Sequence, residues 1–187
     1  EMRVAMYAHA ANGGIKIDKT AHTGVEGLYA CGEATGGMHG ADRIGGLSSA
    51  NGIVFGRIAG ASAALTAQKE PEAALKADIT LPQYGIATTD AERLTHSLRH
   101  TMSTFCMINR TETGLSEALQ QLESLQDKVM ALSKPHTDDS EIAALARLQS
   151  QIQLAQEMVK AMRKRTESLG SHYRADYTGH LSKAEHN

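Results

Sequence analysis

The sequence contains few of the residues that mark secreted, membrane-spanning or metal-binding proteins. Its two cysteines, Cys31 and Cys106, have no metal-site spacing and give no sign of a disulfide framework. No apolar run approaches the roughly eighteen residues that a transmembrane helix needs, and no signal-peptide pattern opens the chain. We therefore expect a reducing, cytoplasmic compartment.

Strong charge of either sign is also lacking. The formal net charge is −2 and 41% of the residues are hydrophobic, so electrostatics favour neither nucleic acid nor an anionic membrane as a partner. A phosphate-binding Gly-x-Gly-x-x-Gly after an opening strand is missing as well. The chain enters strand-like sequence directly at Glu1, which suggests the C-terminal piece of something longer.

Glycine divides the chain, because thirteen of its seventeen glycines lie in residues 1–60. We predict a first domain over 1–70, a linker over 71–89 and a helical domain over 90–187. Within the first domain we expect three short strands, followed by a helix from Ala50 to about residue 66 with Ser48 or Ser49 as its N-cap. The expected strands are Val4–Ala8, Ile15–Asp18 and a buried one at Val25–Cys31.

Three amphipathic helices are predicted in the second domain, over about 90–109, 114–133 and 141–168. The third carries an apolar stripe at three- and four-residue steps, which runs from Ile142 to Met162. Short connections between such helices favour an antiparallel bundle. We expect the stretch from Gly170 onward to be polar and irregular.

A glycine-crowded loop links the last expected strand to the first helix. Glu33 directly follows Gly32, and a carboxylate at a strand end can accept hydrogen bonds from ribose or ribityl hydroxyls; a solvated loop carboxylate is the alternative. Ser48 and Ser49 open a helix just after Gly46, where free N–H groups and partial positive charge suit an anion. An ordinary N-cap would give the same pattern.

Arg43 lies within this loop, four residues after His39, while His9 belongs to an earlier glycine turn. Arginine binds carboxylates through paired hydrogen bonds, so these three side chains could bind a small dicarboxylate. The alternative is an arginine paired with Asp42 and two surface histidines.

Several of these segments resemble a known family. HGADRIGGLS at 39–48 and VFGRIAG at 54–60 are similar to the flavoprotein subunits of fumarate reductase and succinate dehydrogenase, a group that includes L-aspartate oxidase. GLYACGE at 27–33 resembles the strand in which a Gly-Glu pair holds the ribityl chain of FAD. His9 precedes Gly13 as the family's substrate-binding histidine does, and residues 165–177 resemble the closing motif of its helical domain.

The resemblance implies the C-terminal portion of a Rossmann-like α/β FAD-binding domain, followed by an all-α three-helix domain. It implies FAD as the cofactor and hydride transfer between the flavin and a C4 dicarboxylate. Substrate carboxylates would bind His9 and Arg43. The FAD would contact Gly32, Glu33, Gly46, Ser48 and Ser49, with Glu33 on the ribityl group and the helix N-terminus at the pyrimidine edge.

The family's Gly-x-Gly-x-x-Gly and the capping domain with its catalytic arginine lie upstream of the segments matched here. We therefore expect a fragment that holds no catalytic residue, binds no metal and is inactive without the upstream portion of the protein. Activity like that of L-aspartate oxidase is one alternative. The other is a non-catalytic helical module that docks on an iron–sulfur or electron-transfer subunit, which would place the chain at the periphery of the inner membrane.

Overall fold

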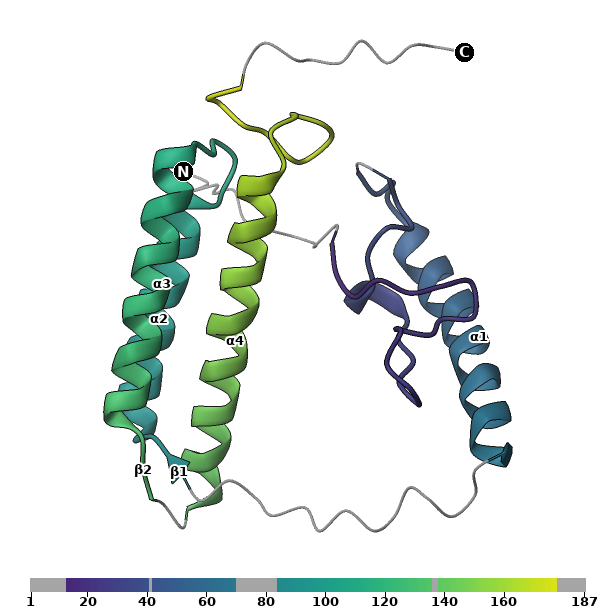
Figure 1. The fold of residues 1–187 in the computed structure, drawn as a ribbon, viewed down its shortest axis with the longest axis horizontal. Helices are drawn as coiled ribbons and strands as arrows, with labels where there is room; N and C mark the ends of the chain where they lie inside the picture. Colours follow the sequence, from purple (N-terminus) through teal and green to yellow (C-terminus); the bar gives the residue numbers. More distant parts are fainter. Residues whose placement is uncertain (1–12, 41, 70–83, 136–137, 178–187) are drawn as a thin grey trace, which may run out of the picture. The chain divides into compact units, whose positions relative to one another are not determined.

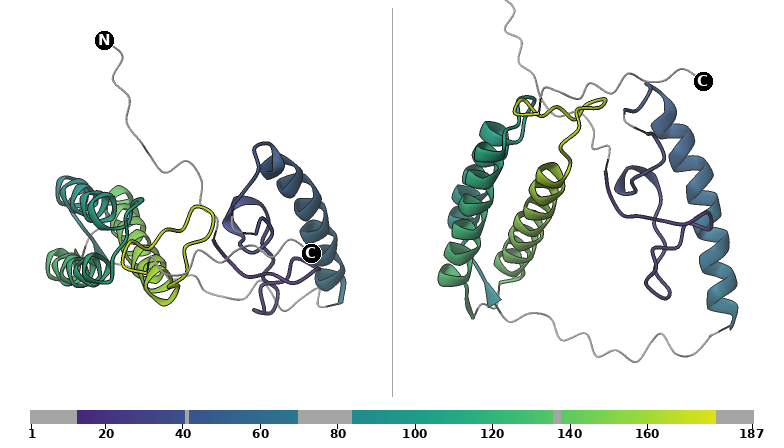
Figure 2. Two further views of the ribbon diagram at one scale, coloured as in Figure 1. Left: turned by 90° about the horizontal axis from the view of Figure 1, so that it is seen from above. Right: turned by 45° about the horizontal axis from the view of Figure 1, so that its top comes forward.

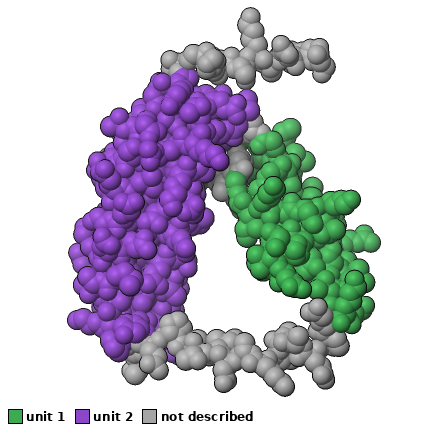
Figure 3. All heavy atoms as spheres, in the orientation of Figure 1, with its two compact units in different colours: residues 1–79 green, residues 80–187 purple. Residues whose placement is uncertain are grey.

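The computed structural model describes residues 13–40, 42–69, 84–135 and 138–177. The chain divides into two compact units, Glu1–Ile79 and Thr80–Asn187, which Figure 3 distinguishes by colour. Three predicted features lie outside the described residues: His9, the strand at Val4–Ala8 and most of the linker between Pro71 and Pro82. Each unit is described by itself below.

Unit 1 consists of a looped segment followed by one long helix. The loop contains a single turn of 3-10 helix, η1 (Gly32–Ala34), and the helix is α1 (Leu47–Lys69) (Figure 1). Two isolated bridges cross the loop: a parallel one between Ile15 and Thr35 and an antiparallel one between His22 and Tyr29. Between residues 13 and 69 the described chain forms no continuous sheet.

The prediction of strands at Ile15–Asp18 and Val25–Cys31 was therefore wrong in extent, and the second was wrong in burial. Val25 is 60% exposed and Leu28 is 51% exposed, and Cys31 is exposed too. An apolar run becomes a buried strand only when neighbouring strands complete a ladder beside it. The described residues of unit 1 supply single bridging residues and no such neighbours, so the Rossmann-like arrangement stays a prediction.

Two glycines let the loop of unit 1 close on itself. The backbone N–H of Ile15 donates to the carbonyl of Ala34 (2.9 Å), and that of Gly36 donates to the carbonyl of Ile15 (3.1 Å). A Cβ built on Gly14 would lie 2.4 Å from the Ala34 carbonyl oxygen, and one on Gly36 would lie 2.7 Å from the Gly14 nitrogen. Only glycine permits the backbones to approach this closely.

Helix α1 begins three residues earlier than predicted, so Ser48 and Ser49 lie in its first turn and do not precede it. The phenol of Tyr29 shares a 2.7 Å hydrogen bond with the hydroxyl of Thr66, which ties the loop to the last turns of the helix. Among the described residues, unit 1 buries only Asn51 and Ala59 of this helix. Most of the apolar side chains of α1 are therefore exposed within the described structure.

Unit 2 is a bundle of three helices, α2 (Thr88–Phe105), α3 (Glu112–Leu132) and α4 (Asp139–Lys164), as Figures 1 and 2 show. Two short strands, β1 (Tyr84–Gly85) and β2 (Lys134–Pro135), pair antiparallel with Tyr84 opposite Pro135. The predicted three-helix architecture is confirmed. Its core is formed mainly by buried aliphatic side chains from all three helices, including Leu94, Leu98, Leu115, Leu122, Val129, Leu148, Ile152 and Val159.

The helix ends differ from the predicted ones for local reasons. Thr111 is the N-cap of α3, because its hydroxyl accepts the N–H of Gly114 at 3.1 Å. Asp138 is the N-cap of α4, since its carboxylate accepts the N–H of Ser140 at 2.8 Å. Helix α4 stops at Lys164, four residues before the predicted end, where the chain turns into a strap over 165–177. No described helix is long and apolar enough to span a bilayer.

Candidate functional site

The glycine-rich loop of unit 1 places Gly32 and Glu33 in the short helix η1. The hydroxyl and the N–H of Thr35 both donate to the carbonyl of Gly32, at 2.6 and 3.1 Å, and so close the turn. Thr35 itself is buried. The Glu33 side chain is exposed, and no residue in the described part of the chain hydrogen-bonds its carboxylate. A carboxylate in this state can accept hydrogen bonds from hydroxyl groups of a ligand.

The N-terminus of α1 forms the second part of the site. Gly46 precedes the helix with φ at +88°, a conformation that favours glycine. The N–H groups of Leu47 and Ser49 donate to the carbonyls of Ile44 and Gly46, each at 3.2 Å. Ser48 and Ser49 are exposed, and the first turn carries no acidic residue. The positive end of the helix dipole is therefore left without a compensating carboxylate in that turn.

Arg43 is half-buried at the end of the loop and points its guanidinium toward α1. Its Nη1 donates to the hydroxyl of Ser48 at 3.4 Å, and its backbone N–H donates to the carboxylate of Asp42 at 2.8 Å. The structure thus brings together two residues that the sequence singled out separately. A guanidinium and a helix N-terminus side by side can bind an anionic or electron-rich group.

His39 lies against α1, where its Nε2 is 3.3 Å from the side-chain nitrogen of Asn51. Asn51 is only 8% exposed, and its Oδ1 has no hydrogen-bond partner among the described residues. Sequence reasoning grouped His39 with Arg43 and missed Asn51 altogether. An amide in an otherwise small and apolar stretch of helix was the signal that could have drawn attention to it.

These features fit FAD as the group that the loop and helix would hold. The ribityl chain of FAD presents hydroxyl groups, which an exposed carboxylate such as Glu33 can bind. The flavin ring presents an edge that gains negative charge on reduction, which the N-terminus of α1 can stabilise.

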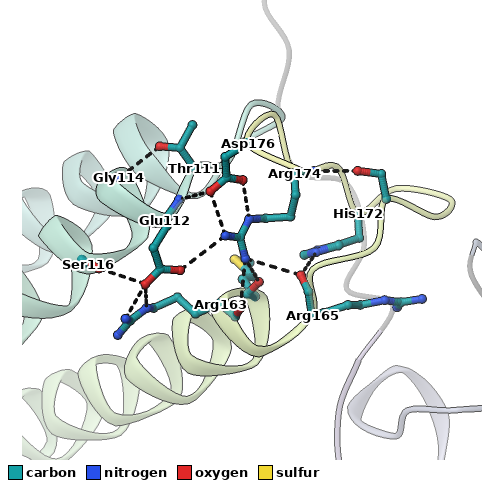
Figure 4. A network of polar contacts seen from close by, with 11 residues as sticks. Thr111, Glu112, Gly114, Ser116, Arg163, Arg165, His172, Arg174 and Asp176 are labelled. Atoms are coloured by element: carbon teal, nitrogen blue, oxygen red, sulfur yellow. Dashed lines mark hydrogen bonds and ion pairs between the residues drawn. The ribbon is translucent and has the colours of Figure 1, made fainter. Parts of the chain in front are cut away.

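A second polar cluster lies in unit 2, in the segment that was predicted to be irregular (Figure 4). Arg174 is fully buried, and its Nε and Nη2 both donate to the carboxylate of Asp176 at 2.9 Å. Its Nη1 donates to the carbonyls of Met162 and Arg163, each at 3.0 Å. Its Nη2 also lies 3.3 Å from the carboxylate of Glu112.

This cluster joins the ends of two helices to the strap and serves structure. Glu112, in the first turn of α3, also pairs with Arg163 near the end of α4. Hydrogen bonding to Arg174 lowers the pKa of Asp176 to about 2, and hydrogen bonding to Arg163 lowers the pKa of Glu112. Because the guanidinium of Arg174 is occupied on all its nitrogens, it has no donor to spare for a ligand.

Sequence profiles of known families match both parts of the chain. Residues 95–184 match the profile described as "Fumarate reductase flavoprotein C-term", and residues 1–49 match one described as "FAD binding domain". The first covers the helices and strap of unit 2, apart from the start of α2. The second covers the glycine-rich loop and the beginning of α1.

Individual proteins agree with these profiles. One subunit of the fumarate reductase (CoM/CoB) of Methanothermobacter marburgensis is 32% identical over 184 residues, which cover 94% of this chain and 34% of that protein. L-aspartate oxidase of Mycobacterium bovis is 34% identical over 171 residues, covering 91% and 30%. A solved Escherichia coli quinol fumarate reductase chain matches with a TM-score of 0.76 and 30% identity, covering 90% and 31%. The chain thus spans about a third of the length of the relatives it matches.

Proposed function

Because this chain belongs to the family of fumarate reductase and succinate dehydrogenase flavoprotein subunits, we propose that it is part of an FAD-dependent oxidoreductase that transfers a hydride between the flavin and a C4 dicarboxylate. The single observation that carries the proposal is the approach of Arg43 to Ser48 at the N-terminus of α1, inside the segment matched by the FAD-binding profile. Residues 1–70 would then be the C-terminal part of a Rossmann-like FAD-binding domain.

The geometry of the loop supports the proposed cofactor contacts. Glu33 would accept hydrogen bonds from ribityl hydroxyls, and the turn closed by Thr35 and Gly32 fixes the backbone that carries this carboxylate. Gly46, Ser48 and Ser49, at the positive end of α1, would hold the pyrimidine edge of the ring with backbone and hydroxyl groups. When bound, FAD supplies the two-electron chemistry that these side chains lack.

Substrate binding is assigned to Arg43 and His9. The 3.4 Å contact between the guanidinium of Arg43 and the hydroxyl of Ser48 is long for a hydrogen bond, so a carboxylate can displace it at little cost. Paired hydrogen bonds from a guanidinium to a carboxylate fix both the position and the orientation of the substrate. His9 lies outside the described residues and is assigned by its resemblance alone.

Oxidation of L-aspartate is the second candidate activity. It is favoured by the 34% identity to L-aspartate oxidase, a value no lower than the identity to the fumarate reductase relative. L-Aspartate also carries two carboxylates, so Arg43 would serve either substrate. For hydride transfer to or from a C4 dicarboxylate, we further propose that the flavin exchanges its electrons with a separate iron–sulfur or electron-transfer subunit.

Substitutions of Arg43 and Glu33 in the full-length protein test the proposal. Arg43→Ala should weaken binding of fumarate or succinate by about 10- to 100-fold, the worth of hydrogen bonds to a charged group, while bound FAD stays at the wild-type level. Glu33→Ala should instead lower FAD content. Visible flavin absorbance measures the cofactor, and its perturbation by added dicarboxylate measures the substrate.

Arg57→Ala provides the matched control, since Arg57 is an exposed arginine on α1, the helix whose first turn Arg43 contacts. It should leave both FAD content and dicarboxylate binding unchanged. Turnover with L-aspartate but not with succinate or fumarate would select the second candidate activity. A full-length protein that takes up no FAD, or an Arg43→Ala variant with undiminished dicarboxylate binding, would show the proposal to be wrong.

A further inference from the structure

Arg43 lies in the loop between η1 and α1, of which the structure describes residues 36–40 and 42–46. The loop contains positive-φ glycines at Gly37, Gly40 and Gly46, and glycine leaves the backbone more conformational freedom than other residues do. The contact of Arg43 with Ser48 is 3.4 Å long. The side-chain contact that reaches deeper into α1 is the one from His39 to the buried amide of Asn51.

We propose that Asn51 is a positioning residue that holds, through the ring of His39, the loop that presents Arg43. The inference rests on the proposed function, because it gives Arg43 the task of binding a carboxylate. Asn51 lies in the second turn of α1, a rigid element, while His39 lies four residues before Arg43. The contact therefore fixes the loop close to the guanidinium without itself touching substrate.

The chemistry of the pair allows the contact with either tautomer of neutral His39. As the amide of Asn51 lies, its NH₂ group faces Nε2 and donates to it, with the ring proton on Nδ1. Rotation of the amide brings Oδ1 to the same place, where it accepts from a protonated Nε2. An asparagine at this position can therefore hold the ring of His39 in either tautomer, whereas leucine can form neither hydrogen bond.

The burial of Asn51 supports a task other than stability. Its Oδ1 is buried and lacks a partner in the described part of the chain, and an unpartnered buried acceptor opposes folding. Leucine, which has the same number and branching of side-chain heavy atoms, would occupy the position without burying an unpartnered polar atom. The presence of an asparagine here, at a cost in stability, is explained if its hydrogen bond to His39 positions the loop that carries Arg43.

Hydrogen exchange on the full-length, FAD-bound protein measures the effect directly. In Asn51→Leu, the peptide that contains residues 36–46 should exchange faster, and the dissociation constant for a dicarboxylate should rise about two- to tenfold, as expected for one lost hydrogen bond. FAD content should not change. Gln68→Leu, which makes the same amide-to-leucine change at an exposed position of α1, should match the wild type in all three measurements.

Asn51→Asp restores an acceptor and separates positioning from packing. Its carboxylate can only accept, so nitrogen-15 spectra of the histidine ring should show the proton of His39 on Nε2 in this variant. Loop exchange and dicarboxylate binding should return toward wild-type values. The signals of the His39 ring are identified as those that disappear from the nitrogen-15 spectrum of His39→Gln.

The outcomes distinguish this inference from the proposed function. If Asn51→Leu and Gln68→Leu show the same loop exchange, or if the proton of His39 is not on Nε2 in Asn51→Asp, the inference is wrong. If the wild type binds no dicarboxylate while Asn51→Leu still loosens the loop, the proposed function is wrong and the positioning role of Asn51 stands.

Discussion

Replacement of Arg174 by alanine should strongly destabilise unit 2. The guanidinium is fully buried and donates to the carbonyls of Met162 and Arg163 at 3.0 Å. Each hydrogen bond from a charged donor is worth about 1.5–3 kcal/mol, and since water can reach part of the opened site we take the lower value for both. The expected loss is about 3 kcal/mol, without any contribution from the exposed carboxylates.

A loss of this size is a large part of the stability of a small domain. It corresponds to a fall in melting temperature of about 12–24 °C for a unit of about 100 residues. Unfolding in guanidinium chloride, followed by circular dichroism, measures the free energy of unfolding. Faster hydrogen exchange in peptides from α3 and α4 assigns the change to unit 2. Arg174→Lys should recover only part of the loss, because an ammonium cannot reproduce the planar fork.

Arg147→Ala is the matched control, because Arg147 is an exposed arginine on α4; it should change stability by less than about 0.5 kcal/mol. If Arg174→Ala lost no more stability than this control, the network would contribute nothing to folding and the reasoning would fail. Unchanged exchange in α3 with a destabilised α4 would also contradict it, since the cluster is argued to join both helices.

Two further predictions concern titrating groups of the described structure. The pKa of Asp176 is lowered to about 2 by hydrogen bonding to Arg174, so its contribution is fully present above the ordinary aspartate value of 3.8 and is lost as the pH falls toward 2. The free energy of unfolding should therefore decrease as the pH falls through that window, and it should decrease less in Asp176→Asn. Equal slopes of this free energy against pH in the two proteins would contradict this assignment. Burial raises the pKa of the Cys106 thiol to about 11, whereas Cys31 is exposed. Iodoacetamide at neutral pH should therefore alkylate Cys31 in the folded protein and leave Cys106 intact until denaturant is added, as peptide mass spectrometry can check; labelling of both at similar rates would refute the burial.

The bundle could be predicted from the sequence because its signal is local. The residues of α4 that recur at three- and four-residue steps, such as Leu148, Ile152 and Val159, are those that the core buries. Helical periodicity needs no knowledge of partners. The strand expected at Val25–Cys31 failed for the opposite reason, since an extended segment is stabilised by neighbours that can be distant in sequence.

The candidate site could be predicted in its residues but not in its contacts. Arg43 and Ser48 were chosen for their chemistry, and the sequence could not tell that one would donate to the other. Asn51 was missed because a single amide, although unusual in that small and apolar stretch of helix, has no spacing that ties it to the other site residues. Arg174 resembled part of a closing motif, but one of its ion-pair partners, Glu112, lies 62 residues away.

That separation in sequence has a kinetic consequence. Because Arg174 in the strap over 165–177 bonds Glu112 at the start of α3 and carbonyls at the end of α4, we expect these bonds to form only after the two helices have docked. Interactions absent from the transition state leave the folding rate alone and slow unfolding. On this reasoning the bonds of Arg174 slow unfolding and lengthen the lifetime of the folded bundle. A chain emerging from the ribosome would gain that protection only once residues 165–177 have been synthesised.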